Sequence, residues 1–122
     1  MIMSGETRLP PAVQERLLRL QQLQETLQAI LAQKQQLDLE LLEIDRALSE
    51  LEKVSDDVVI YKSIGSLLIK TNKAKVTSEL NERKELASMR VSVLTKQEER
   101  IRSQIKDLQE KLQKDLQPLS PA

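Results

Sequence analysis

Apolar residues recur every seven positions along two long segments of the chain, residues 12–54 and 76–116. In the first segment ten of twelve positions at alternating spacings of three and four are apolar, and only Arg16 and Lys34 are polar. So narrow a stripe is typical of a coiled-coil seam rather than of a globular-core helix. The seam residues are Val13, Arg16, Leu20, Leu23, Leu27, Ile30, Lys34, Leu37, Leu41, Ile44, Leu48 and Leu51, then Thr77, Leu80, Lys84, Ala87, Val91, Leu94, Glu98, Ile101, Ile105, Leu108 and Leu112. The pattern predicts two long helices, over residues 11–53 and 73–116.

The segment between the helices has a different pattern. Ser55, Asp56 and Asp57 favour a turn, because their short polar side chains compete for backbone hydrogen bonds. Residues 58–70 are then dense in β-branched side chains, with Gly65 in the middle. This composition predicts a β-hairpin with its turn at residues 64–66; a continued helix is the competing interpretation.

Both faces of the predicted hairpin are apolar. Val59, Tyr61 and Leu68 alternate with the remaining apolar positions. An isolated two-stranded hairpin is marginally stable in water, and its edges leave backbone groups without strand partners. Since the sequence offers no further strand, we expect other chains to complete the sheet. The residues expected to drive this oligomerisation are Val58, Val59, Ile60, Tyr61, Ile64, Gly65, Leu67, Leu68 and Ile69.

Two seams of nearly equal length on either side of a short hairpin predict an antiparallel pair of helices. In such a pair, the residue numbers of any two seam residues that face each other add up to the same value, which defines the register. The short connection between the helices favours a register of 128. This register places Arg16 opposite Leu112 and Lys84 opposite Ile44. A register of 121 is the alternative.

Composition narrows the function classes. The chain has 122 residues, zero net charge and no cysteine or histidine, which excludes disulfides and thiolate or imidazole chemistry. We therefore expect no enzyme activity, no cofactor and no metal. Balanced charge disfavours nucleic-acid binding, and the absence of a long apolar run disfavours a membrane span. The first residues lack an apolar signal core, so we expect a cytoplasmic protein.

Several runs resemble the β-type subunit of the prefoldin family. The most specific is the hairpin Val59–Ile69, in which Tyr-Lys and Leu-Ile flank the central glycine between two equal helical arms. A single hairpin is similar to the β-type rather than the α-type subunit. The other similar runs are Leu9–Gln14, Gln21–Gln24, Gln33–Leu37, Ala47–Glu52 and Lys96–Arg100.

The resemblance implies a mainly α fold, a coiled-coil hairpin whose β-hairpin joins an oligomeric β-barrel platform. It further implies a hexamer of two α-type and four β-type subunits that holds unfolded client proteins without ATP and delivers them to a group II chaperonin. The start of the second helix, with Lys73 and Lys75, departs from the family by being less acidic, and residues 117–122 are expected to be disordered. A structural coiled-coil adaptor without chaperone activity is the alternative.

The distal ends of the arms are the expected client-binding site, because they lie at the two ends of the chain, away from the hairpin. Leu17 and Leu116 fall outside the seam there, next to the polar Arg16. A weakened last layer would offer apolar side chains to unfolded chains of many sequences. The expected client-binding residues are Leu9, Val13, Leu17, Leu20, Leu108, Leu112 and Leu116.

Overall fold

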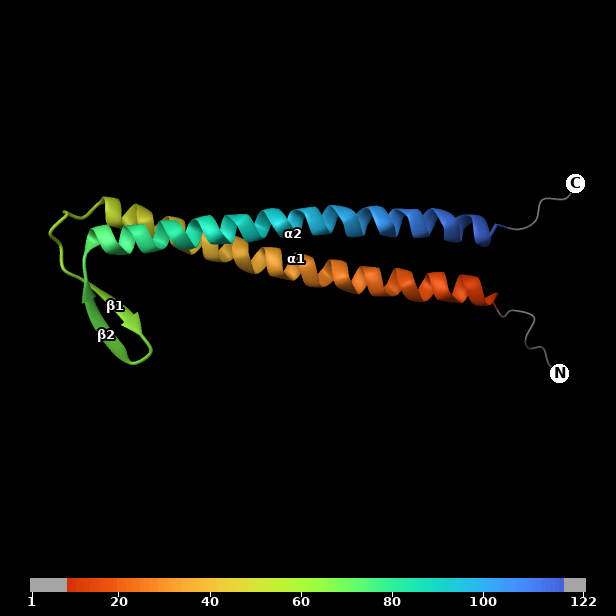
Figure 1. The fold of residues 1–122 in the computed structure, drawn as a ribbon, viewed down its shortest axis with the longest axis horizontal. Coiled ribbons are helices and arrows are strands. Elements are labelled where there is room, and N and C mark those ends of the chain that lie inside the picture. Colours follow the sequence, from red (N-terminus) through yellow and green to blue (C-terminus); the bar gives the residue numbers. More distant parts are fainter. Residues whose placement is uncertain (1–8, 118–122) are drawn as a thin grey trace, which may run out of the picture. The chain divides into compact units, whose positions relative to one another are not determined.

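The computed structural model describes residues 9–117 and contains two helices and two strands (Figure 1). Along the chain these are α1 (Pro11–Glu52), β1 (Ile60–Ile64), β2 (Leu67–Thr71) and α2 (Lys73–Asp115). Both helices end one residue earlier than the sequence predicts. The β-hairpin starts two residues later, at Ile60, because Val58 donates its N–H to the carbonyl of Ser55 and still belongs to the connecting turn. The expected disorder of the tail falls, from residue 118 on, outside the described residues.

Contacts divide the chain into two units, one formed by residues 33–94 and the other by the flanking residues on both sides. In the unit 33–94, residues near Gln33 lie beside residues near Leu94, and residues near Leu51 lie beside Val76 and Leu80. Residues later in α1 thus lie beside residues earlier in α2. The two helices are antiparallel in this unit, as the sequence predicts.

The core in both units is the predicted seam. Every seam residue is buried or half-buried, and the most buried apolar side chains are all seam residues. These are Val13, Leu23, Ile30, Ile44, Ala87, Leu94, Ile105 and Leu112. Burial of this thin stripe supplies the main stabilisation of the helices, since long helices owe most of their stability to packing of one face.

Two ion pairs between the helices fix the register. In the unit 33–94, Lys84 lies 2.8 Å from Asp45, the neighbour of its expected partner Ile44. In the other unit, Arg16 pairs with Asp115, one helical turn from its expected partner Leu112. A register of 121 would instead place Lys84 opposite Leu37. The predicted register of 128 is confirmed.

The turn of the β-hairpin requires glycine at one position. Strands β1 and β2 pair antiparallel from Ile60–Thr71 to Ile64–Leu67, which leaves a two-residue loop of Gly65 and Ser66. Gly65 has φ +57°, a value that is unfavourable for residues with a Cβ. A positive φ at the first loop residue is the arrangement of a type II′ turn, whose twist matches that of the strands.

A lysine ties the start of α2 to the end of α1. The Nζ of Lys73 donates a 2.8 Å hydrogen bond to the carbonyl of Val54 and lies 3.4 Å from the carboxylate of Asp56. Its charge opposes the dipole of α2 but lies at the favourable, negative end of α1. Asn72 caps α2 by accepting the N–H of Lys75 at 2.9 Å. The basic start of α2 is therefore part of the connection between the helices.

Candidate assembly and client-binding surfaces

The hairpin exposes nearly all of its apolar side chains. Residues 61–70 are exposed without exception, and Leu68 reaches 72 %. Val58 and Ile60 are half-buried, while Val59 is exposed. Exposed apolar residues gathered on one short element mark an interaction surface.

Strand pairing assigns these side chains to two faces. Residues that are Cα partners across an antiparallel pair point to the same side. One face therefore carries Ile60, Ile64, Leu67 and Ile69, and the other carries Tyr61 and Leu68. Both faces carry apolar side chains, as the sequence predicts; the first carries more of them, with Lys62 among them opposite Ile69. A sheet with two apolar faces needs cover on both sides.

The described residues contain no strand beyond β1 and β2, so each strand has one edge without a strand partner in this chain. Such an edge is a template for pairing with a strand of another chain. The hairpin thus offers both of the contacts that build a larger sheet, apolar packing and backbone hydrogen bonds.

The hairpin is also held against α2. The Nζ of Lys62 lies 3.1 Å from the carboxylate of Glu79. A groove of about 580 Å³ runs between β1 and the helices, with Ile60 and Tyr61 on the strand side and Val76 and Leu80 among its helical residues. The ion pair and the residues around the groove place β1 beside α2.

The expected client-binding residues divide into two groups. Leu17 and Leu116 are exposed, at 38 % and 56 %. The remaining five lie in or beside the closed seam: Val13 and Leu112 are buried, and Leu9, Leu20 and Leu108 are half-buried. The apolar area that a client could reach in this structure therefore comes from residues outside the seam.

Two features at the tip were missed by sequence reasoning. Leu18 is exposed at 57 % beside Leu17 and enlarges the apolar surface. Asp115 continues the seam spacing of α2 one step past Leu112 and pairs with Arg16, so the two polar residues satisfy each other. The heptad count could have found both, because it places Asp115 in the seam and Leu18 on the face of α1 opposite the seam.

Two kinds of feature are absent from the residues that the structure describes. Across residues 9–117, no helix is long and apolar enough to cross a membrane. Over the same residues, no group of three or more acidic side chains is placed to hold a metal ion.

Comparisons with known proteins agree with this geometry. The family model described as "Prefoldin subunit" matches residues 14–118. The prefoldin subunit beta of Methanothrix thermoacetophila is 46 % identical over 98 % of this chain and 98 % of its own length. That of Pyrococcus furiosus is 43 % identical over 90 % of this chain and 94 % of its own.

A solved structure has the same fold. The crystal structure of the prefoldin beta subunit from Thermococcus strain KS-1 matches with a TM-score of 0.84 and 39 % identity, covering 92 % of this chain and 98 % of that one. The alternative of a coiled-coil adaptor without chaperone activity is not favoured by these relatives. With two long helices, one β-hairpin and near full-length similarity to β subunits, the chain belongs to the prefoldin family of chaperone subunits.

Proposed function

We propose that this chain is the β-type subunit of an ATP-independent holdase that assembles through its β-hairpin and binds unfolded proteins at its helix tips. The observation that carries the proposal is the exposed apolar hairpin, whose two faces and two edges need partner chains. The similar proteins are themselves named subunits, which supports assembly with other prefoldin subunits.

The proposed assembly is a hexamer of two α-type and four β-type subunits in the cytoplasm. Hairpins from neighbouring subunits would cover the face of Ile60, Ile64, Leu67 and Ile69 and would pair with the strand edges. The same platform would hold the helix pairs side by side, so that several tips act on one client. Weak contacts repeated over several arms then give useful avidity.

The proposed client site consists of Leu17, Leu18 and Leu116, with Leu9, Val13, Leu20, Leu108 and Leu112 behind them in the seam. The exposed leucines offer apolar area without a shaped pocket, which suits unfolded chains of many sequences. Such binding requires no cofactor and no chemical step. Delivery of the held protein to a group II chaperonin completes the proposed function.

Two sets of substitutions test whether assembly depends on the hairpin and client binding on the helix tips. We expect Ile60→Asp with Ile69→Asp to abolish assembly, because two unpaired charges cannot be buried in a sheet interface. We expect Leu17→Asp, Leu18→Asp and Leu116→Asp together to leave assembly intact and to remove most of the suppression of client aggregation. Sedimentation velocity measures assembly, and light scattering of a chemically unfolded client measures suppression.

Each set is the control for the other, since both place aspartates at apolar surface positions. An intact particle from the hairpin variant would contradict the proposed assembly surface. Full protection of the client by the assembled tip variant would contradict the proposed client site.

A further inference from the structure

The last two layers of the seam at the helix tip each combine one apolar and one charged residue. In the register of 128, Arg16 of α1 faces Leu112 of α2, and Val13 is level with Asp115. The two apolar side chains are buried. The two charged side chains pair with each other across the seam and are exposed at 37 % and 24 %. The ion pair therefore borders the buried apolar contact at the point where the seam ends.

Asp115 occupies an unfavourable position in its own helix. It is the last residue of α2, where the negative end of the helix dipole repels a carboxylate. Lys114 beside it carries the charge that this end of a helix favours. The cost is offset by the contact with Arg16 of the other helix. The acidic residue is thus explained by its contact across the tip and not by the preference of the helix.

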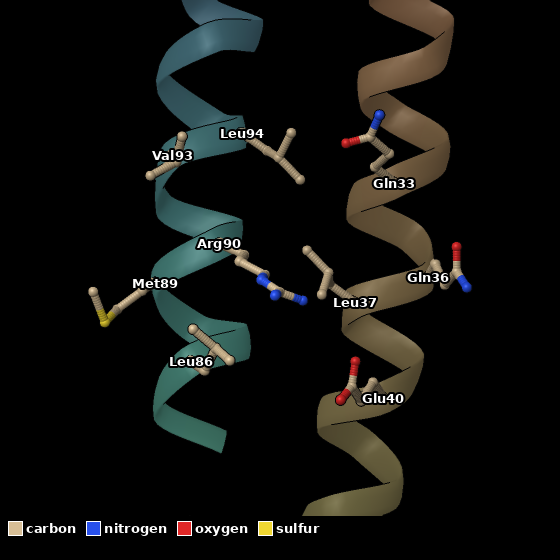
Figure 2. A pocket seen from close by; sticks show the side chains of 9 residues that line it. All are labelled: Gln33, Gln36, Leu37, Glu40, Leu86, Met89, Arg90, Val93 and Leu94. Atoms are coloured by element: carbon tan, nitrogen blue, oxygen red, sulfur yellow. The ribbon is translucent and has the colours of Figure 1, made fainter. Parts of the chain in front are cut away.

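The charged layers lie where both helices end, so neighbouring layers support them from one side only. In the middle of the helices, layers follow on both sides; there Leu37 of α1 and Leu94 of α2 point toward each other into the space between the helices (Figure 2). Opening the tip breaks contacts in one direction, whereas opening the middle would break them in two. The tip is therefore the part of the seam that opens at the lowest free-energy cost.

The exposed leucines of the proposed client site lie beside the ion pair. Leu17 follows Arg16 in the sequence, and Leu116 follows Asp115. A client chain that covers these leucines reaches the charged pair, and an open tip would add the two buried side chains of the last layers to the area that it can cover. The client then takes the place of the partner helix, so most of the apolar area exposed by opening is buried again.

The ion pair makes a small contribution to closing the tip, and this contribution depends on salt. A partly exposed pair changes the ratio of closed to open tips by up to about five-fold. Dissolved ions screen its charges over about 8 Å at physiological ionic strength. Two leucines in the same place would close the tip more firmly, since buried apolar area contributes more than an exposed ion pair. A charged pair suits a contact that must form and break.

We propose that the pair of Arg16 and Asp115 is a latch, which closes the tip of the seam in the free chaperone and opens when a client binds. The inference rests on the proposed function, because it concerns the same client site. In the closed state the latch keeps Val13 and Leu112 away from water and from other apolar surfaces. In the open state these two side chains bind the client, while the latch charges become hydrated and contact no part of it.

Two conservative variants remove the latch with little change in the shape of the tip. Asp115→Asn and Arg16→Gln each delete one charge from full-length subunits, which are assembled into the complete particle with the α-type partner. Because clients bind the open tip, a larger open fraction lowers the apparent dissociation constant in proportion. The probe is fluorescently labelled α-lactalbumin, kept unfolded by reduction and carboxymethylation. We expect both variants to bind it several-fold more tightly than the unmodified particle.

Hydrogen exchange on the opposite helix shows whether the tip has opened. Asp115→Asn should speed the exchange of backbone amides at residues 13–20 of α1, and Arg16→Gln should do so at residues 108–115 of α2. Each effect crosses the seam, so the local influence of a substitution on its own helix does not produce it. Raising the salt concentration should speed exchange in the unmodified tip and change the variants much less.

Asp107→Asn and Arg19→Gln are the matched controls. Both residues are exposed and lie outside the seam, and the substitutions make the same changes of charge, one on each helix. We expect them to leave client affinity and exchange at the tip unchanged. Arg16→Asp with Asp115→Arg rebuilds the ion pair with its charges reversed. We expect this double variant to return both measurements most of the way to those of the unmodified particle.

Unchanged exchange across the seam in both single variants would overturn the latch. Faster exchange with unchanged or weaker client binding would also overturn it, because the closed tip would then be the form that binds. A reversed pair that behaved like the single variants would count against it in the same way. In each of these results the unmodified particle still holds the probe, so the proposed function stands. A particle that never binds the probe would overturn the proposed function, and the latch with it.

Discussion

At the scale of single residues, the turn of the β-hairpin depends on the backbone conformation of one glycine. Gly65 is the only described residue with a positive φ, and a Cβ built there would meet nothing within 4 Å. The requirement for glycine is therefore one of backbone conformation and not of space. The sequence alone predicts this turn, because a glycine centred between two β-branched runs is typical of a hairpin loop.

Gly65→Ala should destabilise the hairpin by about 1–2 kcal/mol, the usual penalty for an L-residue at positive φ. We expect a lower thermal midpoint of the assembled particle at fixed protein concentration. Ser66→Ala is the control, because Ser66 occupies the next loop position without a positive φ. Equal midpoints for the two variants would show that the turn tolerates a side chain at both positions.

At the scale of elements, heptad spacing predicts the helices well because burial follows the same period. Every seam residue is buried or half-buried, including the half-buried polar Lys34 and Lys84. The ends of the hairpin were less predictable: Val58 and Val59 have strand-forming side chains, but the chain needs them to pass from α1 to β1. The same spacing separates buried Val13, in the seam, from exposed Leu17, outside it; sequence reasoning grouped them because it expected the last layer of the seam to open.

Substitutions at the basic start of α2 distinguish the effect of the helix dipole from the effect of the contact with the end of α1. Lys73→Gln should lower stability by about 1 kcal/mol, because it removes the charged donor to the Val54 carbonyl. Lys75→Gln should be neutral or slightly stabilising, because it removes a charge that opposes the dipole of α2. Chemical denaturation of both variants measures the difference. Equal effects would mean that the charge matters only through the helix dipole.

At the scale of the whole molecule, we propose separate roles for the hairpin, in assembly, and for the chain ends, in client binding. The proposed assembly residues come from the middle of the sequence, and the proposed client residues come from both ends. The confirmed register makes it possible to shorten both helices by matching amounts, because residue 20 is level with residue 108. Truncation can therefore remove one proposed surface without altering the other.

Deleting residues 1–20 together with 109–122 should leave a particle with the same number of subunits, because the hairpin is untouched. Suppression of client aggregation should fall sharply, since Leu17, Leu18 and Leu116 are gone. Mass by light scattering and client turbidity measure the two effects on one preparation. Undiminished protection by the shortened particle would move client binding to the remaining helix surface.

The exposed hairpin has a consequence for a subunit that is made without partners. Residues 61–70 then present to water the kind of apolar segment that chaperones capture, together with strand edges that template aggregation. An orphan subunit thus resembles the damaged proteins that its complex is proposed to protect. Balanced synthesis of the partner chains would keep this species scarce, and surplus copies would themselves be targets for quality control.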